Sequence, residues 1–295
     1  MKKIVILLIF CLVVGCSSGE DAPKADFTLE ELEQTNNIDA VFAKYNSVRT
    51  TSIFYDFNYP GAETANFSET TVLVKGSNGI TAYVENSFGY AYAIEKDNVY
   101  FQNPDGAYGL YAFFDDGYFE GYYLPYITEW VMYASSEAEY FISDITADGV
   151  RVITTHIDTG KNPEEAEIWN FEAGAVIEII YELDPQSGLI QNITTFTLKD
   201  GNQDKILMTG SVVYGQDDDY IPPEFVGLCK DMTDTRTVRF IRGDETFTFT
   251  IPAQAVLYPL TTEDYEFFTD PEHTVPFIAN EDYSDGITVY MKQIT

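Results

Sequence analysis

The chain has 295 residues, of which 48 are Asp or Glu and 16 are Lys or Arg, and its formal net charge at pH 7 is −32. A field of this sign repels phosphate backbones, which excludes nucleic acid as a partner. Hydrophobic residues make up 45% of the chain, too many for a disordered acidic protein, so the composition predicts a folded core in one large or two modest domains.

The N-terminus has the layout of a secretory signal. Lys2 and Lys3 precede an apolar run over residues 4–14, which Gly15 and Cys16 follow. The run is too short to cross a membrane as a helix, which takes about 20 apolar residues. One interpretation is a plain signal peptide that happens to end beside a cysteine.

The sequence VVGC at positions 13–16 resembles the lipobox of bacterial lipoproteins. The resemblance implies that residues 1–15 are removed after Gly15 and that the Cys16 thiol carries lipid, with residues 16–26 as a flexible tether. The protein is then expected at the extracytoplasmic face of the cell membrane, with the membrane as a partner through Cys16. Because Ser17 follows the cysteine, sorting to an outer membrane stays open.

The three cysteines predict a chain without disulfides. Cys11 lies in the signal, Cys16 is the expected lipid site, and Cys229 stands alone. Cys229 has two interpretations, a catalytic thiol or a buried structural residue. No histidine lies near it in sequence, which favours the structural interpretation.

The first element expected in the mature chain is a helix. Thr28 and Glu31 have the spacing of a capping box, and Phe27 can pack against Leu32. Apolar residues then recur at helical spacing on one face: Ile38, Val41, Phe42, Tyr45 and Val48. The pattern predicts one amphipathic helix, or a pair, of about 20 residues in all.

Short runs rich in aromatic and β-branched residues follow, separated by tight turns. They cover residues 52–59, 69–75, 80–85, 89–95 and 98–102 and, after a helix expected at 124–141, residues 149–158, 167–171, 175–183, 189–198 and 205–214. Such closely spaced strands predict antiparallel meanders. The expected fold class is α+β, with a large curved antiparallel sheet, an incomplete barrel, and helices on one face. Tyr and Phe are dense between positions 83 and 133, which ordinary sheet packing explains.

Residues 179–190, IIYELDPQSGLI, resemble a strand–turn–strand found in periplasmic lipoprotein carriers of the LolA type, and the order of elements over residues 26–215 is similar to theirs. The resemblance implies a half-barrel domain at 27–215 that holds acyl chains in an apolar cavity. The expected lining residues come from the two helices: Phe42, Tyr45, Ile127, Trp130 and Val131.

Residues 216–236 combine three consecutive aspartates with two prolines, which is typical of a linker. Asp217, Asp218 and Asp219 also suggest a calcium site, but the spacing and terminal glutamate of an EF-hand loop are absent. The linker interpretation is therefore preferred.

The segments EFFTDPEHTVPF at 266–277 and ITVYMK at 287–292 resemble the internalin-type B repeat of Gram-positive surface proteins. The resemblance implies a small β-grasp module at 237–295, an interaction or spacer unit without catalytic residues. The copy departs from the repeat at Glu266-Phe267, where Gly-Trp is usual, and at Met291, where alanine is usual.

Candidate catalytic groups are sparse. His156 lies in an alternating strand and His273 in a turn, and neither has a partner at metal-ligand spacing. Glu164, Glu165 and Glu167 near Trp169 have the composition of a sugar-cleaving site, although a solvated acidic loop explains the same residues. We expect no catalytic residue, no metal and no cofactor, and therefore no enzyme.

Two functions remain from the sequence. The first is a non-enzymatic, lipid-anchored envelope protein that binds an apolar ligand, a lipid or an acyl chain, in its half-barrel domain. The alternative is a surface interaction or adhesion protein whose residues 237–295 contact a protein partner.

Overall fold

The computed structural model describes residues 27–57, 65–76, 79–95, 98–114, 140–158, 160, 174–215, 222–231, 233–260, 265–279 and 285–294. Several predicted features lie outside this part of the chain. They are the signal and tether with Gly15 and Cys16, the lining residues Ile127, Trp130 and Val131, the aspartates 217–219, and the acidic group of Glu164, Glu165 and Glu167 with Trp169.

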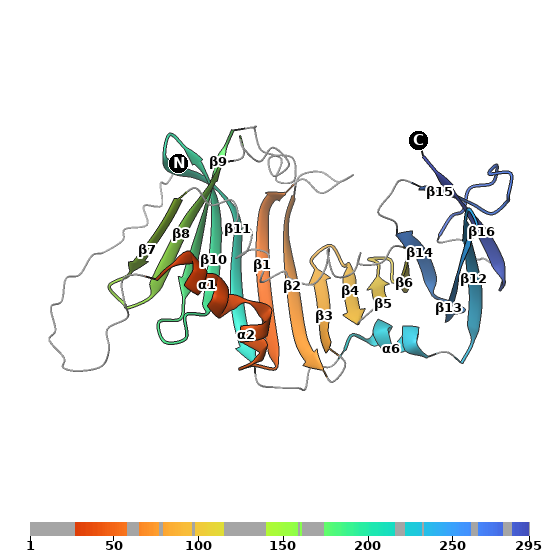
Figure 1. Ribbon diagram of the computed structural model, residues 1–295, viewed down its shortest axis with the longest axis horizontal. Helices are drawn as coiled ribbons and strands as arrows, with labels where there is room; N and C mark the ends of the chain where they lie inside the picture. The colour runs from red at the N-terminus through yellow and green to blue at the C-terminus, as the bar shows by residue number, and fades with distance from the viewer. Residues whose placement is uncertain are drawn as a thin grey trace. The chain divides into compact units, whose positions relative to one another are not determined.

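The described residues form three helices and sixteen strands (Figure 1). The helices are α1 (Leu29–Asn36), α2 (Ile38–Phe42) and α6 (Glu224–Lys230). The first strands are β1 (Ser47–Phe57), β2 (Ala65–Gly76), β3 (Gly79–Asn86), β4 (Ala91–Glu95), β5 (Asn98–Gln102) and β6 (Tyr108–Phe113). Next come β7 (Tyr140–Ile145), β8 (Arg151–Asp158), β9 (Val176–Leu183), β10 (Ile190–Lys199) and β11 (Asn202–Gly215). The last are β12 (Thr235–Arg242), β13 (Glu245–Pro252), β14 (Val256–Leu260), β15 (Tyr265–Phe268) and β16 (Ile287–Gln293).

Twelve strands form one sheet in the order β14-β6-β5-β4-β3-β2-β1-β11-β10-β9-β8-β7, and four form a second in the order β13-β12-β16-β15. The chain divides into two compact units. Unit 1 comprises Met1–Lys44, Ser52–Asn66 and Ile127–Val213, and unit 2 comprises Tyr45–Thr51, Phe67–Tyr126 and Tyr214–Thr295. Each unit is described separately below.

The α+β class, with helices covering one face of an antiparallel sheet, is wrong. In the described part of the chain, strands account for 61% of the residues and helices for 10%. The sheets are also mixed, because β14 pairs parallel with β6 and β12 pairs parallel with β16. The excess of β-branched and aromatic residues explains the outcome, since these side chains pack well on a pleated surface.

The first predicted helix begins as expected and ends early. Thr28 Oγ1 accepts a hydrogen bond from Glu31 N at 3.1 Å and Thr28 N donates to Glu31 Oε2 at 2.8 Å, which confirms the capping box. Asn37 then interrupts the helix, because its side chain accepts from Ala40 N at 2.9 Å and starts α2. Val48, expected on the helix face, instead lies in β1.

Two further elements differ from expectation. Tyr140 begins strand β7, although the helix expected at 124–141 included it. Helix α6 lies inside the stretch expected to be a linker, where Phe225, Val226 and Cys229 are buried. These three residues, at positions i, i+1 and i+4, give the short helix one buried apolar face. Among the described residues, no helix has the length and apolar character needed to cross a membrane.

In unit 1, a buried asparagine ties α1 to the β9–β10 turn. Asn36 Nδ2 donates to Leu32 O and Gly188 O at 3.0 and 3.1 Å, and Ile190 N donates to Asn36 Oδ1 at 2.9 Å. The turn itself is held by Asp184, whose Oδ1 accepts from Ser187 N at 2.7 Å and Ser187 Oγ at 2.8 Å. These bonds lower the pKa of Asp184, the backbone bond most strongly.

In unit 2, the small sheet encloses an aromatic core together with the ends of β6 and β14. Strands β12 and β13 form a hairpin and pair antiparallel from Thr235 to Pro252. Phe114 packs edge-to-face against Phe240 and Phe247, with ring centroids 4.9 and 5.1 Å apart. The buried cluster also contains Ala112, Val238, Ile251, Leu257, Val289 and Met291.

The loop after β15 is the stretch that carried the B-repeat resemblance, and Asp270 holds it. Its carboxylate accepts from Val275 N at 2.6 Å, from Thr274 Oγ1 at 2.8 Å and from Thr274 N at 3.0 Å. Desolvation acts to raise the pKa of Asp270, but these hydrogen bonds outweigh it and lower the pKa. Asp270 therefore stabilises the loop by accepting several hydrogen bonds from the loop's own backbone and side chains.

Candidate functional site

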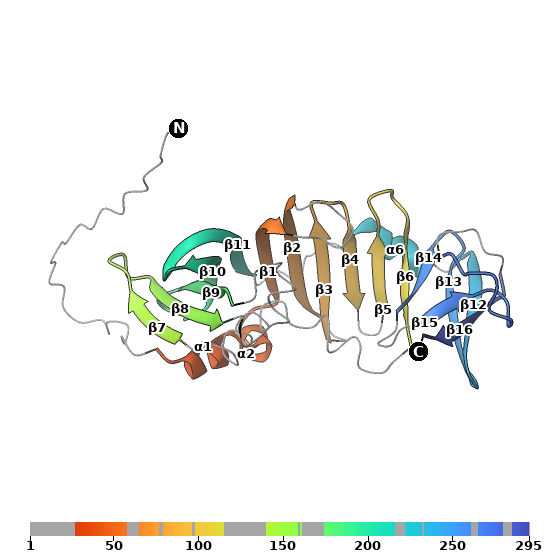
Figure 2. The ribbon, with the colours of Figure 1, turned by 90° about the horizontal axis from the view of Figure 1, so that it is seen from above.

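The large-sheet strands of unit 2 have two distinct faces, and α6 covers one of them (Figure 2). Phe225, Val226 and Cys229 of α6 pack against alternate residues of neighbouring strands: Val72, Tyr83, Ala93 and Tyr100. Lys230 at the end of α6 pairs with Glu95 at 2.5 Å. This face is therefore a packed core.

The opposite face, here called the inner face of unit 2, carries the intervening residues. Strand register aligns Thr71 with Val84, Val84 with Tyr92, and Tyr92 with Phe101. A second row aligns Leu73, Ala82, Ile94, Val99, Tyr111 and Tyr258. The inner face is therefore almost entirely apolar or aromatic.

Three half-buried tyrosines surround the fully buried Phe101 on this face. The Phe101 ring lies 4.8 Å from that of Tyr111 and 5.0 Å from that of Tyr258, and Tyr111 lies 6.2 Å from Tyr92. The four residues come from β4, β5, β6 and β14, and we call them the tyrosine cluster. Adjacent aromatic rings with solvent-accessible faces can take up a flat or extended apolar group.

Polar side chains interrupt the inner face at one end. Glu69 follows Phe67 in β2 at the next inward position, and desolvation raises the pKa of its carboxyl group from 4.5 to about 7. The neighbouring Phe67 and Phe88 rings stack at 5.4 Å and supply an apolar surrounding. Thr71 in β2 and Thr50 in β1 are both buried on this unit.

Of the five predicted lining residues, the structure describes two, Phe42 and Tyr45. Phe42 is buried at the end of α2 in unit 1. Tyr45 belongs to unit 2, where its ring lies 5.2 Å from that of Tyr214. Ile127, Trp130 and Val131 fall outside the described residues, so their role stays a prediction.

The sheet of unit 1 also has one apolar face. Alternate residues of β8 and β9 are buried there, among them Ile153, Ile157, Ile177 and Ile179. Tyr181 is fully buried among them, and desolvation raises the pKa of its hydroxyl above its usual range. Asn36 and the β9–β10 turn close one end of this face, as described above.

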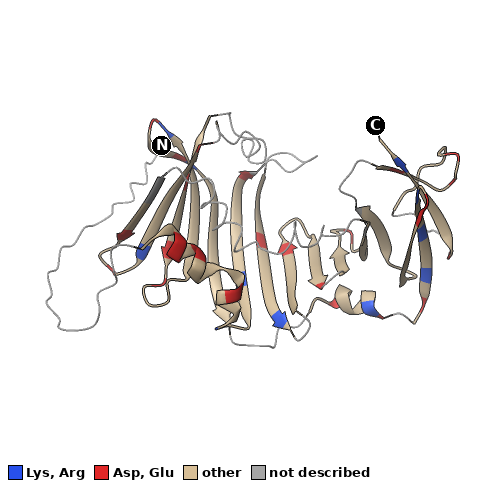
Figure 3. Ribbon diagram, viewed as in Figure 1, with Lys and Arg blue, Asp and Glu red and all other residues tan. Residues whose placement is uncertain are grey.

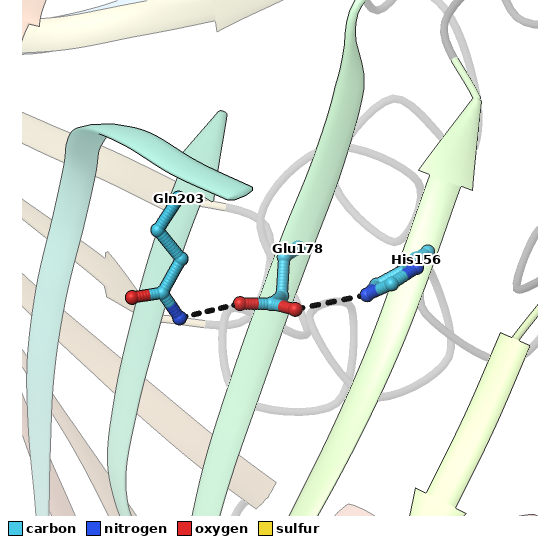
Figure 4. A network of polar contacts seen from close by, with 3 residues as sticks. All are labelled: His156, Glu178 and Gln203. Carbon is cyan, nitrogen blue, oxygen red and sulfur yellow. Dashed lines mark hydrogen bonds and ion pairs between the residues drawn. The ribbon is translucent and has the colours of Figure 1, made fainter. Parts of the chain in front are cut away.

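The other face of unit 1 holds the polar network of His156, Glu178 and Gln203 (Figure 4). His156 Nε2 lies 2.9 Å from Glu178 Oε2, and Gln203 Nε2 donates to Glu178 Oε1 at 2.6 Å. The three residues come from β8, β9 and β11. The network therefore ties three strands together through their side chains, as expected for a satisfied histidine.

The remaining candidate groups are structural. Cys229 is fully buried, its Sγ donates to Gly109 O at 3.6 Å, and desolvation raises its pKa to about 12, which makes it a poor nucleophile. The His273 ring packs edge-on against Phe268 at 5.2 Å. The described residues contain no group of three or more His, Cys, Asp or Glu side chains arranged to hold a metal ion.

Sequence reasoning missed the tyrosine cluster and Glu69. The alternation in residues 91–94 and 98–101 contained the signal for Tyr92 and Phe101, but the aromatic density there was interpreted as ordinary packing. Tyr258 joins through the parallel pairing of β14 with β6, which links positions more than 140 residues apart in a way that no local pattern encodes.

No protein-family model matches the chain, and no curated protein matches it. Among solved structures, the crystal structure of the Mycobacterium tuberculosis lipoprotein LppX is similar over 66% of this chain and 97% of its own, with 11% sequence identity and a TM-score of 0.35. A TM-score this low does not establish a shared fold, and the similarity assigns the chain to no family.

Proposed function

We propose that this chain is a non-enzymatic, lipid-anchored protein of the cell envelope that binds an apolar ligand on the inner face of unit 2. Cys16 is the anchor, and the ligand is a lipid or another molecule with an acyl chain. The observation that supports the binding role is the tyrosine cluster, in which half-buried rings from four strands lie together on one apolar face.

Charge supports an apolar rather than an anionic ligand. The chain carries a net charge of −32, and acidic positions are spread over the described elements (Figure 3). Anionic molecules are repelled by such a field, whereas burial of apolar surface is insensitive to it. An apolar ligand therefore fits both the face and the charge of the molecule.

The test is a titration of the purified full chain, carrying Cys16→Ala so that no detergent is needed, with the apolar dye N-phenyl-1-naphthylamine. Tyr111→Ala removes the central ring of the cluster and should weaken dye binding about tenfold, since burying an aromatic side chain contributes about 1.5–3 kcal/mol. Tyr290→Ala, which removes a half-buried tyrosine from the small sheet, is the matched control and should change nothing.

Organic extraction of the wild-type chain followed by mass spectrometry should recover a bound lipid. A chain that yields no lipid and does not enhance dye fluorescence would show that the proposal is wrong. The rival adhesion role is better tested by point substitutions than by deleting residues 237–295, because that deletion removes β14 and opens the core around Phe114.

A further inference from the structure

The polar end of the inner face of unit 2 contains a carboxyl group without a partner. Glu69 forms no hydrogen bond or ion pair with any other residue in the described ranges. Asn86, opposite Glu69 in the register of β2 and β3, uses its Oδ1 to accept from Phe88 N and Tyr90 N at 3.1 and 3.2 Å. The side chain of Asn86 therefore bonds within its own turn and not with Glu69.

A buried hydroxyl lies on the same face. Thr50 is 8% exposed, and its Oγ1 has no hydrogen-bond partner among the described residues. A buried hydroxyl in this condition costs about 1–3 kcal/mol, so a ligand that supplied its partner would recover that cost. The unpartnered oxygen is therefore an independent sign of a polar ligand group.

Strand register places Thr50 near Glu69. Lys75 N donates to Asn46 O at 2.9 Å, which pairs these two residues across β1 and β2. In an antiparallel pair, four residues forward from Asn46 on β1 correspond to four residues back from Lys75 on β2, which puts Thr50 opposite Thr71. Glu69 is two residues before Thr71 and therefore lies on the same face. Thr50 and Glu69 are then diagonal neighbours, about 7–8 Å apart.

The row that starts at this polar end leads into the tyrosine cluster. Thr71, Val84, Tyr92 and Phe101 are successive partners on β2 to β5. With about 4.8 Å between strands, Phe101 lies roughly 14 Å from Thr71. An extended molecule with one polar end matches this arrangement.

The chemistry of the polar end selects among amphiphiles. A carboxylate ligand is repelled by the acidic chain, and placing it beside Glu69 would put two carboxyl groups at one polar end. An ammonium ligand would have to lose its water on an apolar face, which is costly. A neutral hydroxyl can both donate and accept, so it complements the Thr50 hydroxyl and the Glu69 carboxyl at the same time.

We propose that Thr50, Glu69 and Thr71 bind the hydroxyl-bearing end of a neutral amphiphile, such as a monoacylglycerol, whose apolar body lies along the tyrosine cluster. This inference rests on the proposed function and adds the class of ligand and the residues that recognise its polar end.

The experiment uses the full chain with Cys16→Ala and measures affinity for monodecanoylglycerol below its micelle concentration by calorimetry. Thr50→Val and Glu69→Leu should each weaken binding about fivefold to tenfold, the effect of losing one buried hydrogen bond. Their affinity for N-phenyl-1-naphthylamine should stay within about twofold of the parent, because the dye has no hydroxyl.

Thr70 and Glu85 provide matched controls, because they face each other on the opposite side of β2 and β3. Thr70→Val and Glu85→Leu should leave both affinities unchanged. Melting curves check that the variants fold, and Thr50→Ala replaces Thr50→Val if the latter does not. Decanoate and decylamine should both bind at least about tenfold more weakly than monodecanoylglycerol.

The proposal is overturned if Thr50→Val and Glu69→Leu bind monodecanoylglycerol as tightly as the parent chain, or if decanoate or decylamine binds equally well. In that outcome, retained dye binding would leave the proposed function standing. Loss of dye binding by the parent chain would instead overturn both.

Discussion

At the scale of single residues, Glu69 is the most informative ionisable group. Desolvation raises the pKa of its carboxyl from 4.5 to about 7, so the folded chain holds its proton through a pH range in which the unfolded chain has lost it. Below pH 4.5 the carboxyl is protonated in both states, and its contribution to the free energy of unfolding is fully present. This contribution is lost as the pH rises through about 7, because the unfolded chain releases the proton more readily than the folded chain.

Glu69→Gln should remove this dependence. At pH 8 the variant should be more stable than the wild type by about 3 kcal/mol at most, because the shift of 4.5 to about 7 corresponds to that energy, and at pH 4 the two should be nearly equal. Urea unfolding of both chains at pH 4, 6 and 8 measures the difference. A constant difference across this range would contradict the desolvated state of Glu69, and Glu85→Gln is the exposed control.

Asn36 shows how one residue can decide the contact between two elements. Its side chain bonds with Leu32 O, Gly188 O and Ile190 N, so α1 and the β9–β10 turn share one buried amide. Nothing in the local sequence distinguishes Asn36 from the neighbouring Asn37, which serves as the cap of α2. Asn36 is buried and Asn37 is exposed, and this difference depends on how the rest of unit 1 packs around α1.

Asn36→Leu should lower the free energy of unfolding by about 2–4 kcal/mol, since Gly188 O and Ile190 N would each lose a buried partner. Urea unfolding monitored by circular dichroism measures the loss. Gln34→Ala, an exposed change on the same helix, should stay within about 0.5 kcal/mol of the wild type. An equally small effect for Asn36→Leu would show that the amide does not hold the turn to the helix.

At the scale of elements, the close approach of β14 to β6 depends on Gly109. A Cβ atom at this position would overlap the backbone of Val256. The same pairing sets Tyr258 beside Tyr111, so a glycine on β6 is a condition for the tyrosine cluster. Only a residue without a side chain allows the two backbones this spacing.

Gly109→Ala should therefore destabilise the chain by about 2 kcal/mol or more and weaken binding of N-phenyl-1-naphthylamine, because Tyr258 is displaced. Gly227→Ala in α6, where an added Cβ meets nothing within 4 Å, should be neutral or stabilise by up to about 1 kcal/mol. Thermal melts and dye titrations measure both. Equal behaviour of the two variants would contradict the role of Gly109.

Elements with a strong local pattern could be predicted. The expected strands at 80–85, 98–102 and 175–183 match β3, β5 and β9 to within a residue or so, because alternation and turn residues are local. The fold class was wrong because the sequence does not show how far a helical pattern continues once β-branched residues such as Val48 follow it. The site was missed because its residues share one face only through strand pairing, and Tyr258 joins that face through β14, which is distant from β6 in sequence.

At the scale of the whole molecule, three of the basic side chains in the described ranges make structural contacts. Arg236 Nη2 donates to Ala255 O at 2.6 Å, Arg242 pairs with Glu245 at 2.9 Å, and Arg151 lies over the Phe27 ring at 4.8 Å. Figure 3 shows basic positions gathered along β12, among more widely distributed acidic ones. With 48 acidic and 16 basic residues, the chain has little to offer an anionic ligand or an anionic membrane surface.

We propose that the lipid on Cys16 attaches the protein to the membrane, since a strongly acidic chain gains nothing from anionic headgroups. Cys16→Ala should abolish incorporation of labelled palmitate and move the protein from the membrane pellet to the soluble fraction, while the melting curve stays unchanged. Cys11→Ala, within the signal, is the matched control and should keep both label and membrane. A Cys16→Ala chain that stays in the pellet after a high-salt wash would show that something other than this cysteine holds the protein at the membrane.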